Sequence, residues 1–142
     1  MSVPTLRDAE ALVGLPTVPG EFDCAHLARL AQERLFGRRL RWPLQGRHPR
    51  GARGRAAAIL RGREQLTDPV AAPDAGDVVL FVQHVDGHAD WHIGTVLMQH
   101  GLPWVLHTND HIGASVLESL ARCCMRGLHV EGFYRWRAAA YE

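Results

Sequence analysis

The sequence contains no lysine, so arginine supplies every cationic side chain other than histidine. Cysteine is scarce: there are three residues, Cys24, Cys123 and Cys124. An odd count with two adjacent cysteines is a poor framework for disulfides, so we expect a reducing compartment. No apolar run approaches the roughly 20 residues that a membrane-spanning helix needs, and we therefore expect no membrane span.

An excess of one charge is also lacking. The formal net charge is +1, which predicts no strong attraction to nucleic acid or to a membrane surface. Residues 1–10 lack the basic and apolar regions of a secretory signal peptide, so we expect a protein that is cytoplasmic at synthesis. A length of 142 residues fits a single domain over residues 1–142, with a substantial core.

The most informative stretch is residues 20–30, where a loop leads into a helix whose first residue is Cys24. Asp23 is a favoured N-cap, and apolar residues recur at helical spacing up to Phe36, before Gly37 as the C-cap. The positive end of the helix dipole favours a thiolate there, which makes Cys24 a candidate nucleophile. The alternative is a small buried apolar side chain, which is commoner for an isolated cysteine.

The second half of the chain has the pattern of an antiparallel meander. Residues 77–85, 89–98 and 102–107 read as strands joined by two tight turns. Helices followed by such a meander predict an α+β fold, with the N-terminal helices packed on an antiparallel sheet. The other elements that we expect are helices over residues 5–13, 53–63 and 112–124, a connector over 66–76 and a strand over 128–136.

Two histidines lie on neighbouring predicted strands. Alternation places His92 and Gly94 on one face, with space beside the glycine, and His107 on the next strand. Pairing of residues near 95 and 105 would bring His92 and His107 to the same end of the hairpin. Because a nucleophile needs a base and the base needs an orienter, we predict the order Cys24, His92, His107. The alternative is that each histidine is structural.

A metal site is a weaker interpretation. Histidines recur every four residues at His84, His88 and His92, and again at His107 and His111. Such spacing groups ligands on a helix, but here a turn interrupts the first set and the flanks read as strands. We therefore expect no metal and no cofactor.

Residues 38–63 contain nine arginines and no acidic residue. The segment is either a solvated surface or a rim that attracts an anionic polymer. Only Trp42 is interleaved with the arginines, which gives little support for stacking on single-stranded nucleic acid, and we expect no nucleic-acid partner.

Three ordered pieces of the chain together span about residues 20 to 110. They are Phe22-Asp23-Cys24 before an apolar helix ending in Phe36-Gly37, Gly76-Asp77-Val78-Val79-Leu80-Phe81, and His92-Ile93-Gly94-Thr95-Val96-Leu97 followed by Val105-Leu106-His107-Thr108. In this order the pieces resemble the NlpC/P60 cysteine peptidases. The resemblance implies a papain-like α+β fold in which Cys24 is the nucleophile, His92 the general base and His107 the orienter.

The resemblance also implies cleavage of amide bonds in bacterial cell-wall peptides through an acyl-enzyme. It places substrate contacts at Asp23, Ala25 and His26. Asp23 matches a family aspartate that can bind the free amine of the substrate, while Ala25 and His26 replace a serine and a glycine. The compact size and missing signal are similar to phage or prophage tail-associated members, which implies phage tail proteins as partners and the virion as a location.

Two other functions stay open. One is a non-catalytic tail-assembly or binding module on the same fold, because a fold does not determine a function. The other is a thiol amidase or acyltransferase that acts on another substrate. Contact of His92 with both Cys24 and His107 would favour an enzyme over a binding module.

Overall fold

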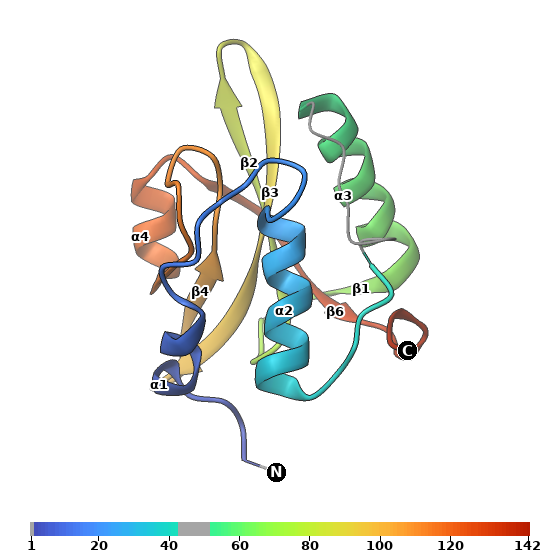
Figure 1. The fold of residues 1–142 in the computed structure, drawn as a ribbon, viewed down its shortest axis with the longest axis vertical. Helices are drawn as coiled ribbons and strands as arrows, with labels where there is room; N and C mark the ends of the chain where they lie inside the picture. Colours follow the sequence, from blue (N-terminus) through green and yellow to red (C-terminus); the bar gives the residue numbers. More distant parts are fainter. Residues whose placement is uncertain (1, 43–51) are drawn as a thin grey trace.

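The structure is a computed structural model that describes residues 2–42 and 52–142. Its strands form one six-stranded antiparallel sheet in the order β1-β6-β2-β3-β4-β5, so the predicted α+β class is confirmed (Figure 1). In the described ranges no helix has the length and apolar character needed to cross a membrane. The elements are α1 (Leu6–Ala9), η1 (Glu10–Leu12), α2 (Cys24–Phe36), α3 (Ala52–Leu66), β1 (Thr67–Val70), β2 (Val78–Val85), β3 (His88–Gln99), β4 (Leu102–His107), β5 (Val116–Ser119), α4 (Leu120–Met125), β6 (His129–Trp136) and η3 (Ala138–Ala140).

Helix α2 begins and ends where the sequence predicts. The Asp23 side chain accepts hydrogen bonds from the backbone N–H groups of Ala25 and His26. At the other end Gly37 has φ 66°, a left-handed conformation that glycine adopts at low cost. These caps fix Cys24 as the first residue of the helix.

The two predicted hairpins are confirmed. Asp86 and Gly87, with φ 49° and 79°, turn the chain between β2 and β3. His100 and Gly101, with φ 52° and 75°, do so between β3 and β4. Two successive positive φ values are typical of the tight turns that match the twist of a hairpin. In the second hairpin Thr95 pairs with Leu106, one position from the predicted register.

The two faces of the sheet carry different core clusters. On one face, α2 and α3 contribute Ala28 and Ile59 to a cluster with Leu80 and Ile93. On the other, Phe81 packs in a cluster to which α4 contributes. Figure 1 shows α2 running along the sheet, with α4 lying apart from α2 at the left of the view. Because strand residues alternate, neighbouring positions on β3 face different helices.

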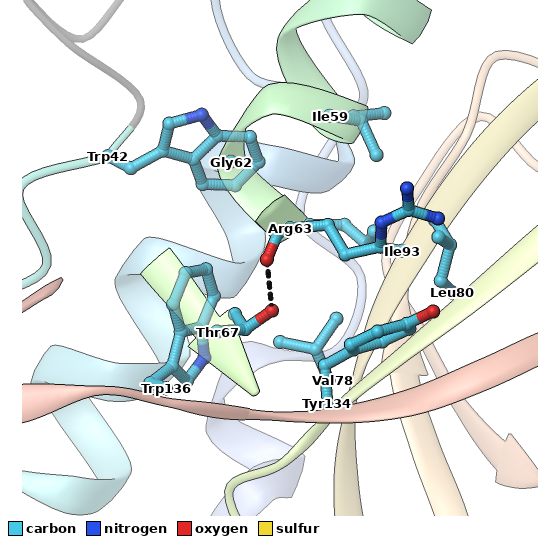
Figure 2. Close-up of a pocket in the computed structure, with 10 residues that line it drawn as sticks. All are labelled: Trp42, Ile59, Gly62, Arg63, Thr67, Val78, Leu80, Ile93, Tyr134 and Trp136. Carbon is cyan, nitrogen blue, oxygen red and sulfur yellow. Dashed lines mark hydrogen bonds between the residues drawn. The ribbon is translucent and has the colours of Figure 1, made fainter. Parts of the chain in front are cut away.

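A small apolar cavity of about 20 Å³ lies between α3 and the sheet. Figure 2 shows Trp42 and Trp136 on one side of it and Tyr134 on another. The hydroxyl of Thr67 donates to the Arg63 carbonyl oxygen, which joins the end of α3 to the start of β1. The gap is smaller than most ligands, so we treat it as part of the core.

Among the described residues of the segment 38–63, three arginines pair with acidic residues outside it: Arg39 with Glu33, Arg55 with Asp110 and Arg63 with Glu131. These pairs favour the interpretation of a solvated, ion-paired surface over that of an open anion-binding rim. The loop that we expected in the first half of the segment lies mostly in residues 43–51, outside the described residues.

Three predicted elements were wrong or incomplete. The helix expected over residues 112–124 is β5 followed by α4, because pairing of β5 with β4 takes the first residues into the sheet. The connector over 66–76 contains β1, an edge strand whose Pro69 is tolerated there. Residues 5–13 hold only a short α1 and the single turn η1. The predicted helix over 53–63 is confirmed within α3.

Candidate active site

A cavity of about 160 Å³ lies at the N-terminal end of α2. Cys24 from α2 and His92 from β3 both line it, so two of the three predicted catalytic residues share one cavity. Charged groups of both signs surround it, including Arg55 from α3 and Asp110 from the loop after β4. Nη1 of Arg55 lies 3.1 Å from Oδ2 of Asp110. The other lining residues are Asp23, Ile59, Gln83, Asp90, Trp91, Thr108, Asn109 and His111.

The Cys24 thiol is neutral in this resting site. Its exposed fraction is 9%, and burial raises its pKa to about 12. The Asp23 carboxylate raises the pKa further, whereas a hydrogen bond from the Ile93 backbone N–H lowers it. Burial therefore outweighs the helix N-terminus, and the expected resting thiolate is not supported.

Four side chains, beginning with His92, are joined in series by hydrogen bonds. Nε2 of His92 lies 2.8 Å from Nδ1 of His107, so the predicted contact between the two histidines is confirmed. Nε2 of His107 lies 2.9 Å from Oε1 of Glu118 on β5. Arg126, at the end of α4, donates from Nε to both oxygens of Glu118 at 2.7 and 2.9 Å. These hydrogen bonds connect the cavity to the protein surface.

Burial and charge set the protonation of this hydrogen-bonded series. The pKa of His92 falls well below its usual value because the ring is buried and because His107 lies beside it. Burial also lowers the pKa of His107, against the opposing effect of Glu118. Burial acts to raise the pKa of Glu118, but hydrogen bonds from Arg126 and His107 leave it lowered. Two neutral imidazoles and an ionised carboxylate therefore form the series near neutral pH.

The first predicted link is not made in the resting site. No hydrogen bond joins Cys24 to His92 among residues 2–42 and 52–142, although both line the cavity. Cys24 packs with Ile93 in the cluster under α2, whereas the His92 ring stacks on Phe81, with centroids 5.8 Å apart. The side chains thus reach the cavity from different sides of β3.

The three predicted substrate contacts separate into two groups. Asp23 lines the cavity, but it is 3% exposed and its Oδ1 already caps α2. Neither the Ala25 nor the His26 side chain lines the cavity, so the structure does not bring these two predicted contacts to it. Ala25 is fully buried in the core, and the His26 ring folds back so that its Nδ1 lies 2.9 Å from Asp23 Oδ1.

Sequence reasoning missed Glu118 and the pairing of Arg55. Glu118 stood inside a segment predicted to be helical, where an acidic residue among apolar ones has no defined partner. As a strand, the same residues place Glu118 opposite Val105, on the face that carries His107. The sequence signal was an acidic residue in the middle of an apolar run, Val116-Leu117-Glu118-Ser119-Leu120.

Buried Cys123 extends this cluster. Its Sγ lies 3.6 Å from Nε2 of His107 and 3.7 Å from Oε1 of Glu118. Such a trio of ligand atoms, all within 4.8 Å, has the composition of a metal site. However, Glu118 already accepts hydrogen bonds from His107 and Arg126, so a cation would have to displace both donors.

Comparisons of the chain with protein-family models, with curated proteins and with solved structures give no match.

Proposed function

We propose that this protein is a cysteine hydrolase that cleaves amide bonds in bacterial cell-wall peptides, with Cys24 as nucleophile and His92 as general base. The observation that carries the proposal is the shared cavity of Cys24 and His92, with the far nitrogen of His92 bound to His107. A nucleophile, a base and a group that orients the base are the parts that acyl transfer requires.

Because both partners rest neutral, the thiol must lose its proton as it attacks. His92 takes the proton of Cys24 while sulfur bonds to the substrate carbonyl carbon, and the carbonyl oxygen becomes an oxyanion. Collapse breaks the carbon–nitrogen bond, and the His92 imidazolium gives its proton to the leaving amine. Water then attacks the thioester carbon while His92 accepts one of its protons. Collapse breaks the carbon–sulfur bond, His92 returns the proton to the Cys24 sulfur, and the acid leaves the site.

The start of α2 supplies a donor for the oxyanion. The Asp23 side chain occupies the N–H groups of Ala25 and His26. The N–H of Cys24 has no acceptor within the part of the chain that the structure describes. An N–H at this position stabilises negative charge on a bound carbonyl oxygen.

A peptide substrate fits the charges of the cavity. Arg55, which pairs with Asp110, can also pair with a substrate carboxylate. A free amine can pair with Asp23, as the resemblance implies, or with Asp90, since both carboxylates line the cavity. Cell-wall peptides carry both groups, and the resemblance to NlpC/P60 peptidases points to that class. Carriage in a phage particle, in contact with tail proteins, belongs to the same proposal.

The test is to incubate the purified protein with soluble peptidoglycan fragments and to identify the products by mass spectrometry. We expect new amine and carboxyl ends, and loss of turnover in Cys24→Ala and His92→Ala. Cys124→Ser, which changes an exposed cysteine, is the matched control and should keep its activity. Circular dichroism checks that each variant folds. Turnover that survives Cys24→Ala would contradict the proposal.

A non-catalytic binding module is the second candidate. The neutral Cys24 thiol and the missing hydrogen bond to His92 among the described residues favour it. If this candidate is correct, no fragment is cleaved, and Cys24→Ala binds a tail protein or wall fragment as well as the unchanged protein does. Cleavage of another amide in place of wall peptides would instead indicate the third alternative, a thiol amidase.

A further inference from the structure

We propose that Glu118 is a positioning residue, which acts through His107 to hold His92 as the tautomer whose Nδ1 can accept a proton. The inference deepens the proposed hydrolase and rests on it for the role of His92 as base. Glu118 itself does not line the cavity that contains Cys24 and His92. Its effect must therefore pass through the intervening ring.

The carboxylate determines where His107 carries its proton. Glu118 is 7% exposed, and its hydrogen bonds from Arg126 and His107 lower its pKa, so it is ionised near neutral pH. An ionised carboxylate can only accept hydrogen bonds. Nε2 of His107, at 2.9 Å from Oε1, must therefore carry the hydrogen.

The tautomer of His107 in turn determines the tautomer of His92. His107 is completely buried and neutral, so a hydrogen on Nε2 leaves Nδ1 with its lone pair. Nε2 of His92 lies 2.8 Å from that lone pair and must donate to it. Neutral His92 then has its only lone pair on Nδ1. The opposite tautomer would set two lone pairs against each other across 2.8 Å.

The other groups around His107 support this assignment of hydrogens to the two rings. Cys123 from α4 is buried, and burial and Glu118 raise its pKa to about 12, so it adds no second negative charge. As a thiol it donates to Glu118. Arg126, after α4, binds the same carboxylate from the surface side and cannot accept a hydrogen bond. Among the described residues in contact with His107, Glu118 is the only anion that can accept the hydrogen on Nε2.

The functional consequence is a base that is set before substrate binds. With Nε2 committed to His107, Nδ1 of His92 is the nitrogen that remains for the Cys24 proton. After the transfer, the imidazolium donates through both nitrogens, and its Nε2 hydrogen bond to His107 persists. A fixed tautomer of this kind has large effects on catalysis in other triads.

The experiment reads protonation directly, by nitrogen-15 NMR of the histidine rings at pH 7.5 in the full chain without substrate. We expect His92 and His107 each to carry hydrogen on Nε2 only. In Glu118→Leu, which has no acceptor, we expect the Nδ1–H form of His92 to become populated. Glu118→Gln keeps an amide oxygen and should rescue the original tautomer. Arg122→Gln, the matched control, changes an exposed arginine on the same helix and should leave the tautomer unchanged.

A second readout is the rate of Cys24 alkylation by iodoacetamide at pH 7.5. Peptide mass spectrometry scores Cys24 separately from Cys123 and Cys124. Because few Cys24 thiols are ionised at this pH, the rate depends on proton transfer to His92. We expect it to fall by about tenfold or more in Glu118→Leu, and to change little in Glu118→Gln and Arg122→Gln.

Hydrogen on Nδ1 of His92 in the unchanged protein would overturn the inference, and this result needs no variant. So would a folded Glu118→Leu protein that keeps both the tautomer and the alkylation rate, since Glu118 would then be only structural. The NMR measurement needs no turnover. The predicted protonation pattern in a protein that cleaves no amide would therefore contradict the proposed function and not this inference.

Discussion

The bare backbone of Gly94 packs against His107. A Cβ added to Gly94 would lie 3.2 Å from the Cβ of His107 and 2.3 Å from Cγ1 of Val105. The sequence predicted space beside this glycine, but the neighbouring strand fills that space. The position of His107, and hence its contact with His92, depends on the absence of a side chain at Gly94.

We therefore expect Gly94→Ala to lower the free energy of unfolding by about 1–3 kcal/mol, because the overpacked methyl must push β4 away. The same shift should lower the rate of Cys24 alkylation, because His107 moves with its strand. Urea denaturation and the alkylation assay measure the two effects. Val105→Ala removes the closest clash, so the double variant should be more stable than the sum of the two single changes predicts. Additive losses would show that Val105 is not the obstacle.

Asp23 has a structural and a proposed functional role, which two substitutions separate. Asp23→Ala removes the N-cap of α2 and should cost about 1 kcal/mol of stability. Asp23→Asn keeps a capping oxygen for the N–H groups of Ala25 and His26, so its stability should change little. If the carboxylate binds the amine of the substrate, Asp23→Asn should still raise KM for peptides with a free amine. An acetylated peptide is the control, and an equal rise for both peptides would contradict the amine contact.

The pH dependence of Cys24 should differ from that of a free thiol. Because burial raises its pKa to about 12, alkylation should still increase with pH above 8.5, where a free thiol is half ionised. Mass spectrometry of the two peptides compares Cys24 with the exposed Cys124 in the same sample. A plateau below pH 8 for Cys24 would mean that a thiolate is present at rest, against the structure.

Local signals in the sequence were sufficient for α2 and for both hairpins. Asp23 and Gly37 cap the helix through contacts within a few residues, and the two turns need only their own positive φ values. The contact of His92 with His107 followed from alternation and a short turn. These features depend on neighbours in sequence, which is why they could be predicted.

Features set by distant contacts could not be predicted in the same way. Val116–Ser119 has apolar spacing that fits a helix, and only pairing with β4 makes it the strand that carries Glu118. Likewise β1, which contains Pro69, exists because β6 pairs with it. The pKa of Cys24 depends on how deeply the folded chain buries it, and the helix N-terminus alone gave the wrong direction.

The buried histidines should make the protein sensitive to mild acid. Burial lowers the pKa of His92 and His107 in the folded state, whereas both have a usual value of 6.5 when unfolded. The unfolded chain therefore binds more protons below about pH 6.5, so the stability is fully present above that pH and is lost as the pH falls. Glu118 also has a lowered pKa, but its contribution is lost only below its usual value of 4.5.

We expect the free energy of unfolding to decrease between pH 7.5 and 5.5 by on the order of 1 kcal/mol for each buried histidine. Urea denaturation at intervals of half a pH unit measures the slope. His92→Phe removes one titrating ring but keeps an aromatic side chain against Phe81, so its slope should be smaller even if its stability at pH 7.5 differs. An unchanged slope would mean that His92 has the same proton affinity in the folded and unfolded chains. The neutral imidazole that the proposed proton transfer requires at the active site would then lose its support.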